Sequence, residues 1–223
     1  MIPGIVVTAL GTAGLLVAEW RDSPSWRWLF KPLASAGFLL AAVRAPGLQM
    51  PTGAGWLLLA GLVLSAAGDV LLVPKSKRAF IAGIGAFALA HVAYGVWFVT
   101  SGAQPWVAVP CVAVFLAVGH LVWRWLDPHV TGALRVPVRG YVALVSIMAA
   151  CAVAYGASAL AGTAAGSTAG PLAALAPALG GVLFYLSDLA VARHRFVAPA
   201  FVNRAWGLPV YYAAQLLIAS AVS

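Results

Sequence analysis

The chain has 223 residues, of which 63% are hydrophobic and only 8% are charged, and its mean hydropathy is +0.99. A soluble domain has too little interior to bury so much apolar surface, so this composition excludes an ordinary soluble protein. The formal net charge of +8 would suggest nucleic-acid binding in a soluble protein. Here the basic residues lie in short segments beside apolar runs, which indicates contact with an anionic membrane surface and no nucleic-acid partner.

The apolar runs predict the number of membrane spans. About 20 apolar residues cross a bilayer core, so the length allows about eight spans with short loops. The runs predict transmembrane helices over residues 2–18, 28–43, 55–73, 79–100, 106–124, 136–157, 171–192 and 204–222. The first run has no basic residue ahead of it and no small-residue cleavage pattern after it, so we expect a span and not a cleaved leader. The predicted fold class is an all-α integral membrane protein, an eight-transmembrane-helix bundle in which residues 1–223 form a single polytopic membrane domain.

The basic residues alternate between the predicted connections. Every odd-numbered connection carries them, and only Arg44 falls in an even-numbered one. Lysine and arginine resist translocation, so the odd-numbered connections are predicted to be cytoplasmic and both termini to lie outside. With no soluble extension in the sequence, we expect a multi-pass protein of the bacterial inner (plasma) membrane.

A short internal similarity suggests two four-helix pseudo-repeats. Gly68-Asp69-Val70 precedes Arg78-Ala79-Phe80, and Ser187-Asp188-Leu189 precedes His194-Arg195-Phe196. The third and seventh spans would then be equivalent. Apolar spans also resemble one another by composition alone, so chance similarity remains open as the alternative.

Two acidic residues fall inside predicted spans, and they are the candidate catalytic residues. Asp69 and Asp188 each lie in the last third of a span that runs toward the cytoplasm. An intramembrane carboxylate is costly to insert, so it normally faces a partner or a wet cavity and marks function. The structural alternative is that each aspartate caps a helix end or pairs with Lys31 or a loop arginine. The remaining acids fall in loops where we expect water to solvate them: Glu19, Asp22 and Asp127.

Other polar residues of the spans are expected to face the bundle interior, because lipid would leave them without hydrogen-bond partners. Gly61, Ser65 and Asp69 share one helical stripe that predicts packing against other helices. For His91, a role in the core and a role in catalysis are equally compatible with the sequence. Lys31, judged on its position alone, is expected to extend to the membrane interface.

Motifs for several kinds of chemistry are absent from the sequence. No histidine or cysteine pair has the spacing of a zinc site, and the serine nucleophile elbow, phosphate-binding glycine loop and dinucleotide fingerprint are missing. We therefore expect no metal and no cofactor.

Several motifs together resemble the YhhN family of membrane lysoplasmalogenases. They are Lys31-Pro32-Leu33, Gly68-Asp69-Val70-Leu71-Leu72, Phe80-x-x-Gly83-x-x-x-Phe87-x-x-Ala90-His91-x-x-Tyr94, Ser187-Asp188 followed by Arg195-Phe196, and Tyr211-Tyr212-x-Ala214-Gln215-x-Leu217. The block from Gly-Asp to Ala-His-x-x-Tyr is the specific part. The long Ala/Gly/Thr connection over residues 161–170 is less typical.

The resemblance implies hydrolysis of the alkenyl (vinyl) ether bond of lysoplasmalogens, which releases a fatty aldehyde and glycerophosphoethanolamine or glycerophosphocholine. It implies a lysophospholipid substrate that enters from the bilayer, and catalysis by the pair Asp69 and Asp188, one as a general acid and the other as a carboxylate. Which aspartate plays which part stays open. The implied substrate-binding residues are Lys31, as a phosphate contact, and His91, Tyr94, Ser187, Tyr212 and Gln215.

A different class of function is also compatible with the residues. Intramembrane acids and four-helix repeats are typical of small proton-coupled transporters, and a lipid-binding membrane protein would need the same inward polar groups. Transport predicts an access route to the outer face, whereas the polar residues here are concentrated toward the inner half. A purely structural scaffold would leave the two intramembrane acids unexplained.

Overall fold

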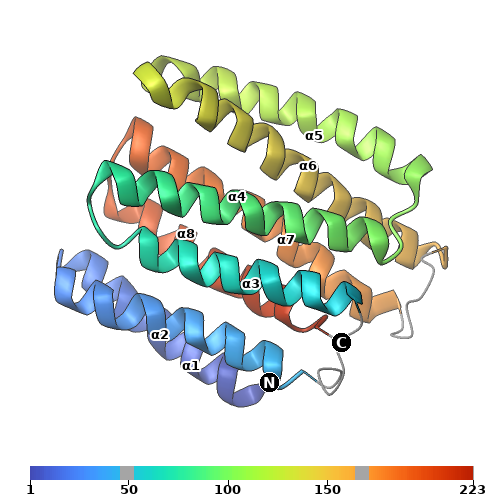
Figure 1. The fold of residues 1–223 in the computed structure, drawn as a ribbon, viewed down its shortest axis with the longest axis horizontal. Helices are drawn as coiled ribbons and strands as arrows, with labels where there is room; N and C mark the ends of the chain where they lie inside the picture. The colour runs from blue at the N-terminus through green and yellow to red at the C-terminus, as the bar shows by residue number, and fades with distance from the viewer. Residues whose placement is uncertain (46–52, 164–170, 223) are drawn as a thin grey trace.

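The computed structural model describes residues 1–45, 53–163 and 171–222, and throughout these ranges the fold is helical. Eight long helices run side by side (Figure 1). They are α1 (Ile2–Trp20), α2 (Pro24–Val43), α3 (Gly53–Leu71), α4 (Lys77–Thr100), α5 (Pro105–Leu126), α6 (Arg135–Leu160), α7 (Pro171–Ala192) and α8 (Phe201–Ala219). Short 3-10 turns, η1 (Asp127–His129) and η2 (Gly132–Leu134), follow α5, and a π-helical turn, η3 (Arg193–Val197), follows α7.

Six of these helices are long and apolar enough to cross a membrane, namely α1, α3, α4, α5, α6 and α7. The other two have similar lengths but carry more polar side chains, among them Lys31 in α2 and Arg204 in α8. The prediction of an all-helical membrane protein is therefore confirmed. The count of eight spans stays a prediction.

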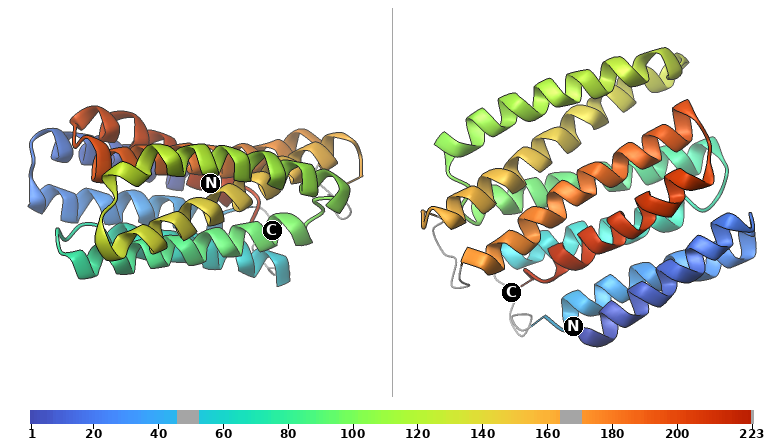
Figure 2. Two further views of the ribbon diagram at one scale, coloured as in Figure 1. Left: turned by 90° about the horizontal axis from the view of Figure 1, so that it is seen from above. Right: turned by 180° about the vertical axis from the view of Figure 1, so that it is seen from behind.

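The helices pair as four antiparallel hairpins. In Figure 1 the α1–α2 hairpin lies at the lower edge, α5–α6 at the upper edge, α3–α4 on the near side and α7–α8 on the far side; the view from behind in Figure 2 agrees. The first and third hairpins thus occupy opposite edges, and the second and fourth occupy opposite sides. This is the arrangement that two four-helix repeats would produce, although the repeat itself stays a prediction.

Both termini lie at the same end of the bundle (Figures 1 and 2). The connections that carry the basic residues, α1–α2, α3–α4, α5–α6 and α7–α8, therefore meet at the other end, which we call the basic end. The helix boundaries depart modestly from the predicted spans. Helix α2 begins at Pro24, before the predicted start at residue 28, because proline suits the first turn of a helix. Most of the Ala/Gly/Thr connection, residues 164–170, lies outside the described residues.

One expectation about the basic end is wrong. Glu19, predicted to be solvated by water, has a side chain that is only 15% exposed, and its Oε2 lies 3.3 Å from Nε of Arg27 and 3.9 Å from Nε of Arg204. These contacts join the end of α1 to the first turns of α2 and α8. The carboxylate thus fixes three helices at the basic end.

Small residues allow the hairpin helices to approach closely. The stripe of Gly61, Ser65 and Asp69 is buried against neighbouring helices, as predicted. In the first hairpin, a Cβ atom on Gly11 would lie 2.6 Å from the backbone nitrogen of Ala34. Real Cβ atoms do not come so close to backbone, so any side chain at this position forces α1 away from α2.

We therefore predict that Gly11→Ala destabilises the protein, because overpacking a helix contact costs about 1–3 kcal/mol. Thermal unfolding in detergent should show a lower midpoint. Gly85→Ala is the matched control, since Gly85 is exposed in α4 and nothing lies within 4 Å of its would-be Cβ. Gly85→Ala should keep or raise the midpoint, because alanine favours a helix more than glycine does. An equal loss in both variants would contradict a specific role for the contact between α1 and α2.

Candidate active site

A cavity of about 100 Å³ lies inside the bundle toward the basic end, and both intramembrane aspartates line it. Asp69 reaches it from α3 and Asp188 from α7. Most of its wall is apolar, and α5 and α6 contribute five aliphatic side chains to it: Val122, Leu126, Val138, Val142 and Val145. Two acidic side chains from distant parts of the sequence therefore meet in one apolar cavity.

Asp69 is almost fully buried and is surrounded by hydrogen-bond donors. Nζ of Lys31 lies 3.4 Å from its Oδ1, while Ser35 Oγ and Tyr211 OH donate to its Oδ2 over 2.7 and 2.8 Å. Three donors, one of them cationic, stabilise the charged form of this side chain. Asp69 thus has partners that can neutralise the negative charge of its carboxylate form.

These contacts also show where the side chain of Lys31 points. Its side chain is 9% exposed and points to Asp69, so the expected extension to the membrane interface is wrong. The structural alternative, an ion pair with Asp69, describes the observed geometry. Pro32 follows within α2, and Lys31 remains inside the helix bundle.

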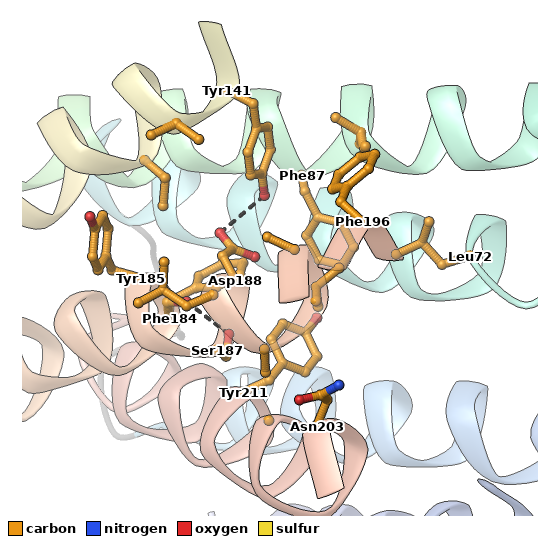
Figure 3. Close-up of a pocket in the computed structure, with 18 of the residues that line it drawn as sticks. Leu72, Phe87, Tyr141, Phe184, Tyr185, Ser187, Asp188, Phe196, Asn203 and Tyr211 are labelled. Carbon is orange, nitrogen blue, oxygen red and sulfur yellow. Dashed lines mark hydrogen bonds between the residues drawn. The ribbon is translucent and has the colours of Figure 1, made fainter. Parts of the chain in front are cut away.

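Asp188 has different neighbours and is more accessible. Its side chain is 15% exposed, Tyr141 OH donates to its Oδ2 over 3.1 Å, and His91 Nε2 lies 3.3 Å from the same oxygen. Figure 3 shows the carboxyl group of Asp188 turned toward Tyr141 within the ring of cavity residues. No lysine or arginine is paired with it among the described residues.

The ring of His91 has a defined orientation. Its Nδ1 lies 2.6 Å from the carbonyl oxygen of Phe87, and because a carbonyl can only accept, Nδ1 carries a hydrogen. Nε2 is buried and forms no regular hydrogen bond within the described part of the chain, yet it faces Asp188. A proton held by the carboxyl group or by Nε2 would therefore lie between these two side chains.

Aromatic rings connect the surroundings of the two acids. Phe87, Phe184 and Tyr211 line the cavity and pack edge to face, with ring centroids 5.4 to 6.0 Å apart. Tyr211 donates to Asp69, whereas the ring of Phe184 packs on His91 at 4.3 Å. The two carboxyl groups share a cavity but not a hydrogen bond, and each has its own set of neighbours.

The residues expected to bind substrate fall into two layers. Lys31 and Ser187 line the cavity, and Ser187 donates to the carbonyl oxygen of Phe184 over 2.8 Å. The others lie behind the wall and are at most 2% exposed: His91, Tyr94, Tyr212 and Gln215.

The rear layer supports the front one through hydrogen bonds. Tyr94 OH donates to Gln215 Oε1 over 2.9 Å and lies 3.3 Å from Ser65 Oγ. Tyr212 OH donates to the backbone carbonyl of Lys31 over 3.4 Å. These side chains hold α3, α4, α8 and α2 in register around the cavity.

Three polar partners of the two acids were not among the predicted site residues: Tyr211, which sequence reasoning placed only within a motif, Ser35 and Tyr141. Ser35 lies one turn after Lys31 on the same face of α2, a spacing that could have indicated a shared target. Tyr141 lies in the second turn of α6, close to Arg135 and Arg139, so it has a depth similar to that of Asp188. This similar depth is the one sequence signal that could have indicated Tyr141 as a partner of Asp188. No group of three or more metal-ligating side chains occurs among the described residues.

Comparison with known proteins identifies the family. The sequence model of the YhhN family matches residues 26–222. Lysoplasmalogenase TMEM86A from Bos taurus is 32% identical over 210 residues, which cover 89% of this chain and 79% of that protein. A Mycobacterium tuberculosis protein named lysoplasmalogenase is 33% identical over 200 residues, 83% of this chain and 66% of that protein.

The uncharacterized membrane protein YhhN from Escherichia coli O157:H7 is 33% identical over 143 residues, which cover 61% of this chain and 64% of that protein. No solved structure gives a significant match. The family match covers most of the chain and includes both aspartates, Lys31 and His91. The chain therefore belongs to the YhhN family.

Proposed function

We propose that this protein hydrolyses the vinyl ether bond of lysoplasmalogens, with Asp188 as the general acid. The observation that carries the proposal is the pair formed by Asp188 and His91, which faces an apolar cavity shared with a second, charge-neutralised aspartate. The names of two relatives, lysoplasmalogenase from Bos taurus and from Mycobacterium tuberculosis, support the same reaction class.

The reaction consumes one water and needs no redox partner. A proton adds to the vinyl carbon farther from oxygen, which leaves an oxocarbenium ion at the carbon bonded to oxygen. Water adds to that carbon and loses a proton, and the resulting hemiacetal collapses to a fatty aldehyde and a glycerophosphodiester, such as glycerophosphoethanolamine, with a free hydroxyl group. Protonation of carbon is the difficult step, so the site needs a positioned acid.

Asp188 fits the acid role better than Asp69 does. It is the more exposed of the two side chains, and its neighbour His91 can hold the same proton without adding a fixed positive charge. After transfer, the single proton released by the added water passes to Asp69 and from there back to the pair, which restores the acid. His91 is a positioning residue in this scheme, because its Nδ1–H bond to the backbone aims Nε2 at the carboxyl group.

Asp69 takes the second role. Its negative charge is held by Lys31, Ser35 and Tyr211, so it is a weak base that can orient water and accept a proton from an already activated adduct. A weak base is sufficient here, because an oxocarbenium ion is electrophilic enough to react with water that is only oriented. The division of labour resembles that of paired carboxylates in glycoside hydrolysis, as an analogy in chemistry alone.

The remaining residues hold the substrate and the site. Ser187 meets the polar part of the substrate, while the aliphatic wall of α5 and α6 receives the hydrocarbon chain. His91, Tyr94, Tyr212 and Gln215 act from behind by fixing the cavity wall. Lys31 contributes indirectly, by stabilising the negative charge of Asp69.

In the membrane, residues 1–223 form one domain of eight spans with both termini outside. The basic end then faces the cytoplasm, because lysine and arginine resist translocation, and bacterial inner membrane is the matching location. A single-chain lipid enters from the cytoplasmic leaflet, where its ether bond lies just below the headgroup. The cavity lies toward this same end of the bundle.

We predict that Asp188→Asn lowers aldehyde release from a lysoplasmalogen in detergent micelles by about 10²–10⁴-fold, the usual contribution of a general acid. The variant should keep the helical circular dichroism of the parent protein. Asp127→Asn, which removes a partly exposed carboxylate that is paired with Arg135 and does not line the cavity, is the control and should turn over normally. Absence of turnover in the parent protein would instead favour proton-coupled transport or lipid binding.

A second prediction concerns the proton itself. In D₂O the released aldehyde should carry one deuterium on the carbon next to the carbonyl, and turnover should be slower. Mass spectrometry after immediate reduction to the alcohol measures this label, with preformed aldehyde incubated alongside the Asp188→Asn variant as the exchange control. An unlabelled product would contradict protonation at carbon.

The third prediction tests whether Lys31 holds Asp69 as a carboxylate. Lys31→Met or Asp69→Asn alone should each lower stability by about 3–5 kcal/mol, because each leaves the other group unpaired in an apolar interior. The double variant should lose less than the sum. The exposed pair of Asp127 and Arg135 is the control, where coupling of about 0–1 kcal/mol is expected. Strict additivity at Lys31 and Asp69 would show that the pair is not energetically coupled.

A further inference from the structure

A second cavity opens at the basic end, beside the first. Its volume is about 650 Å³, and it is formed by the ends of α1 and α7, the starts of α2, α4 and α8, the connection between α3 and α4, and the turn η3. We call it the vestibule. Leu72, Phe80 and Arg204 line both cavities, so the vestibule adjoins the candidate active site.

The vestibule has an excess of positive charge. Four of its lining side chains are arginine or lysine and two are acidic: Arg27, Lys75, Arg195 and Arg204 against Glu19 and Asp22. The two acids are already engaged. Arg27 contacts both of them, and Lys75 Nζ lies 3.9 Å from Asp22 Oδ1. The hydrogen bond from Arg27 lowers the pKa of Asp22, which keeps that carboxyl group ionised.

Two arginines remain for an incoming anion. Arg195 is exposed, has no carboxylate partner among the described residues, and is held with its guanidinium 4.2 Å from the ring centre of Phe80. Arg204 touches Glu19 only at 3.9 Å, and its buried Nε has no hydrogen-bond partner in the described part of the chain. The Phe80 ring that holds Arg195, like Arg204 itself, lies at the junction of the two cavities.

We propose that the vestibule is the headgroup subsite, in which Arg195 and Arg204 bind the phosphate diester of a lysophospholipid. Guanidinium groups match phosphate oxygens in geometry and charge. Lys31 is less suited to this contact, because it lies deeper and is occupied by Asp69. With the phosphate in the vestibule, the glycerol backbone passes the junction and its ether bond reaches Asp188.

This inference deepens the proposed function and rests on it, so its test uses binding without turnover. The probes are a saturated alkyl-ether lysophosphatidylethanolamine, which has no vinyl bond to cleave, and the matching alkylglycerol, which lacks phosphate. Titration calorimetry in a nonionic detergent measures both. Arg195→Gln is the main variant, Arg204→Gln the second, and Arg78→Gln the control, since Arg78 is an exposed arginine at the basic end that does not line the vestibule.

We expect Arg195→Gln and Arg204→Gln each to weaken binding of the phosphorylated probe by about tenfold or more, the loss of a charge-assisted hydrogen bond. Binding of alkylglycerol should not change, and Arg78→Gln should match the parent protein. If Arg204→Gln fails to fold because its contact with Glu19 is lost, Arg195→Gln decides the question alone.

Three results would overturn the inference. The first is equal binding of the phosphorylated probe by Arg195→Gln and by the parent protein. The second is an equal loss of alkylglycerol binding, which would indicate general damage. The third is inorganic phosphate binding as tightly as the lipid, which would assign the arginines to free phosphate. Intact, arginine-dependent lipid binding in a protein that releases no aldehyde would reject the hydrolase and leave the headgroup subsite standing.

Discussion

A carboxylate inside an apolar helix bundle must be neutralised, and this requirement shapes the site. Asp69 meets it with a cation and two hydroxyl donors, contributed by α2 and α8. Asp188 meets it with a tyrosine and an imidazole, contributed by α6 and α4. Because the partners differ in charge, two identical side chains acquire different chemistry. The same contacts tie six helices together in two groups of three, α2, α3 and α8 around Asp69 and α4, α6 and α7 around Asp188.

The sequence predicted the two aspartates of the cavity from the free-energy cost of placing a carboxyl group in a membrane and from the depth of each residue along its span. Asp69 and Asp188 stood out because few residues are so unfavourable in a membrane, and their positions relative to the basic connections set both near one end. The same reasoning predicted the buried stripe of Gly61, Ser65 and Asp69. These inferences need only the helical period and the direction of each span, which a sequence of this composition specifies well.

The partners of each acid were beyond that reasoning. Whether Lys31 extends to the interface or turns inward depends on which helix faces α2, and α8 supplies Tyr211 from the far end of the chain to complete the same cluster. The expectation that water solvates Glu19 was wrong for a similar reason, because Arg204 approaches Glu19 from α8, a helix distant in sequence. Contacts between distant helices are set by packing, which spacing along one helix does not encode.

The placement of α5 at the edge of the bundle has a consequence for how the family can diversify. This helix packs mainly on α6, only 11% of its most apolar stretch is buried, and yet Val122 and Leu126 reach the cavity wall. Both carboxyl groups and their partners come from other helices. Under the proposed function, exchanging side chains on this one peripheral helix would alter the preference for tail length and leave the two aspartates and their partners unchanged.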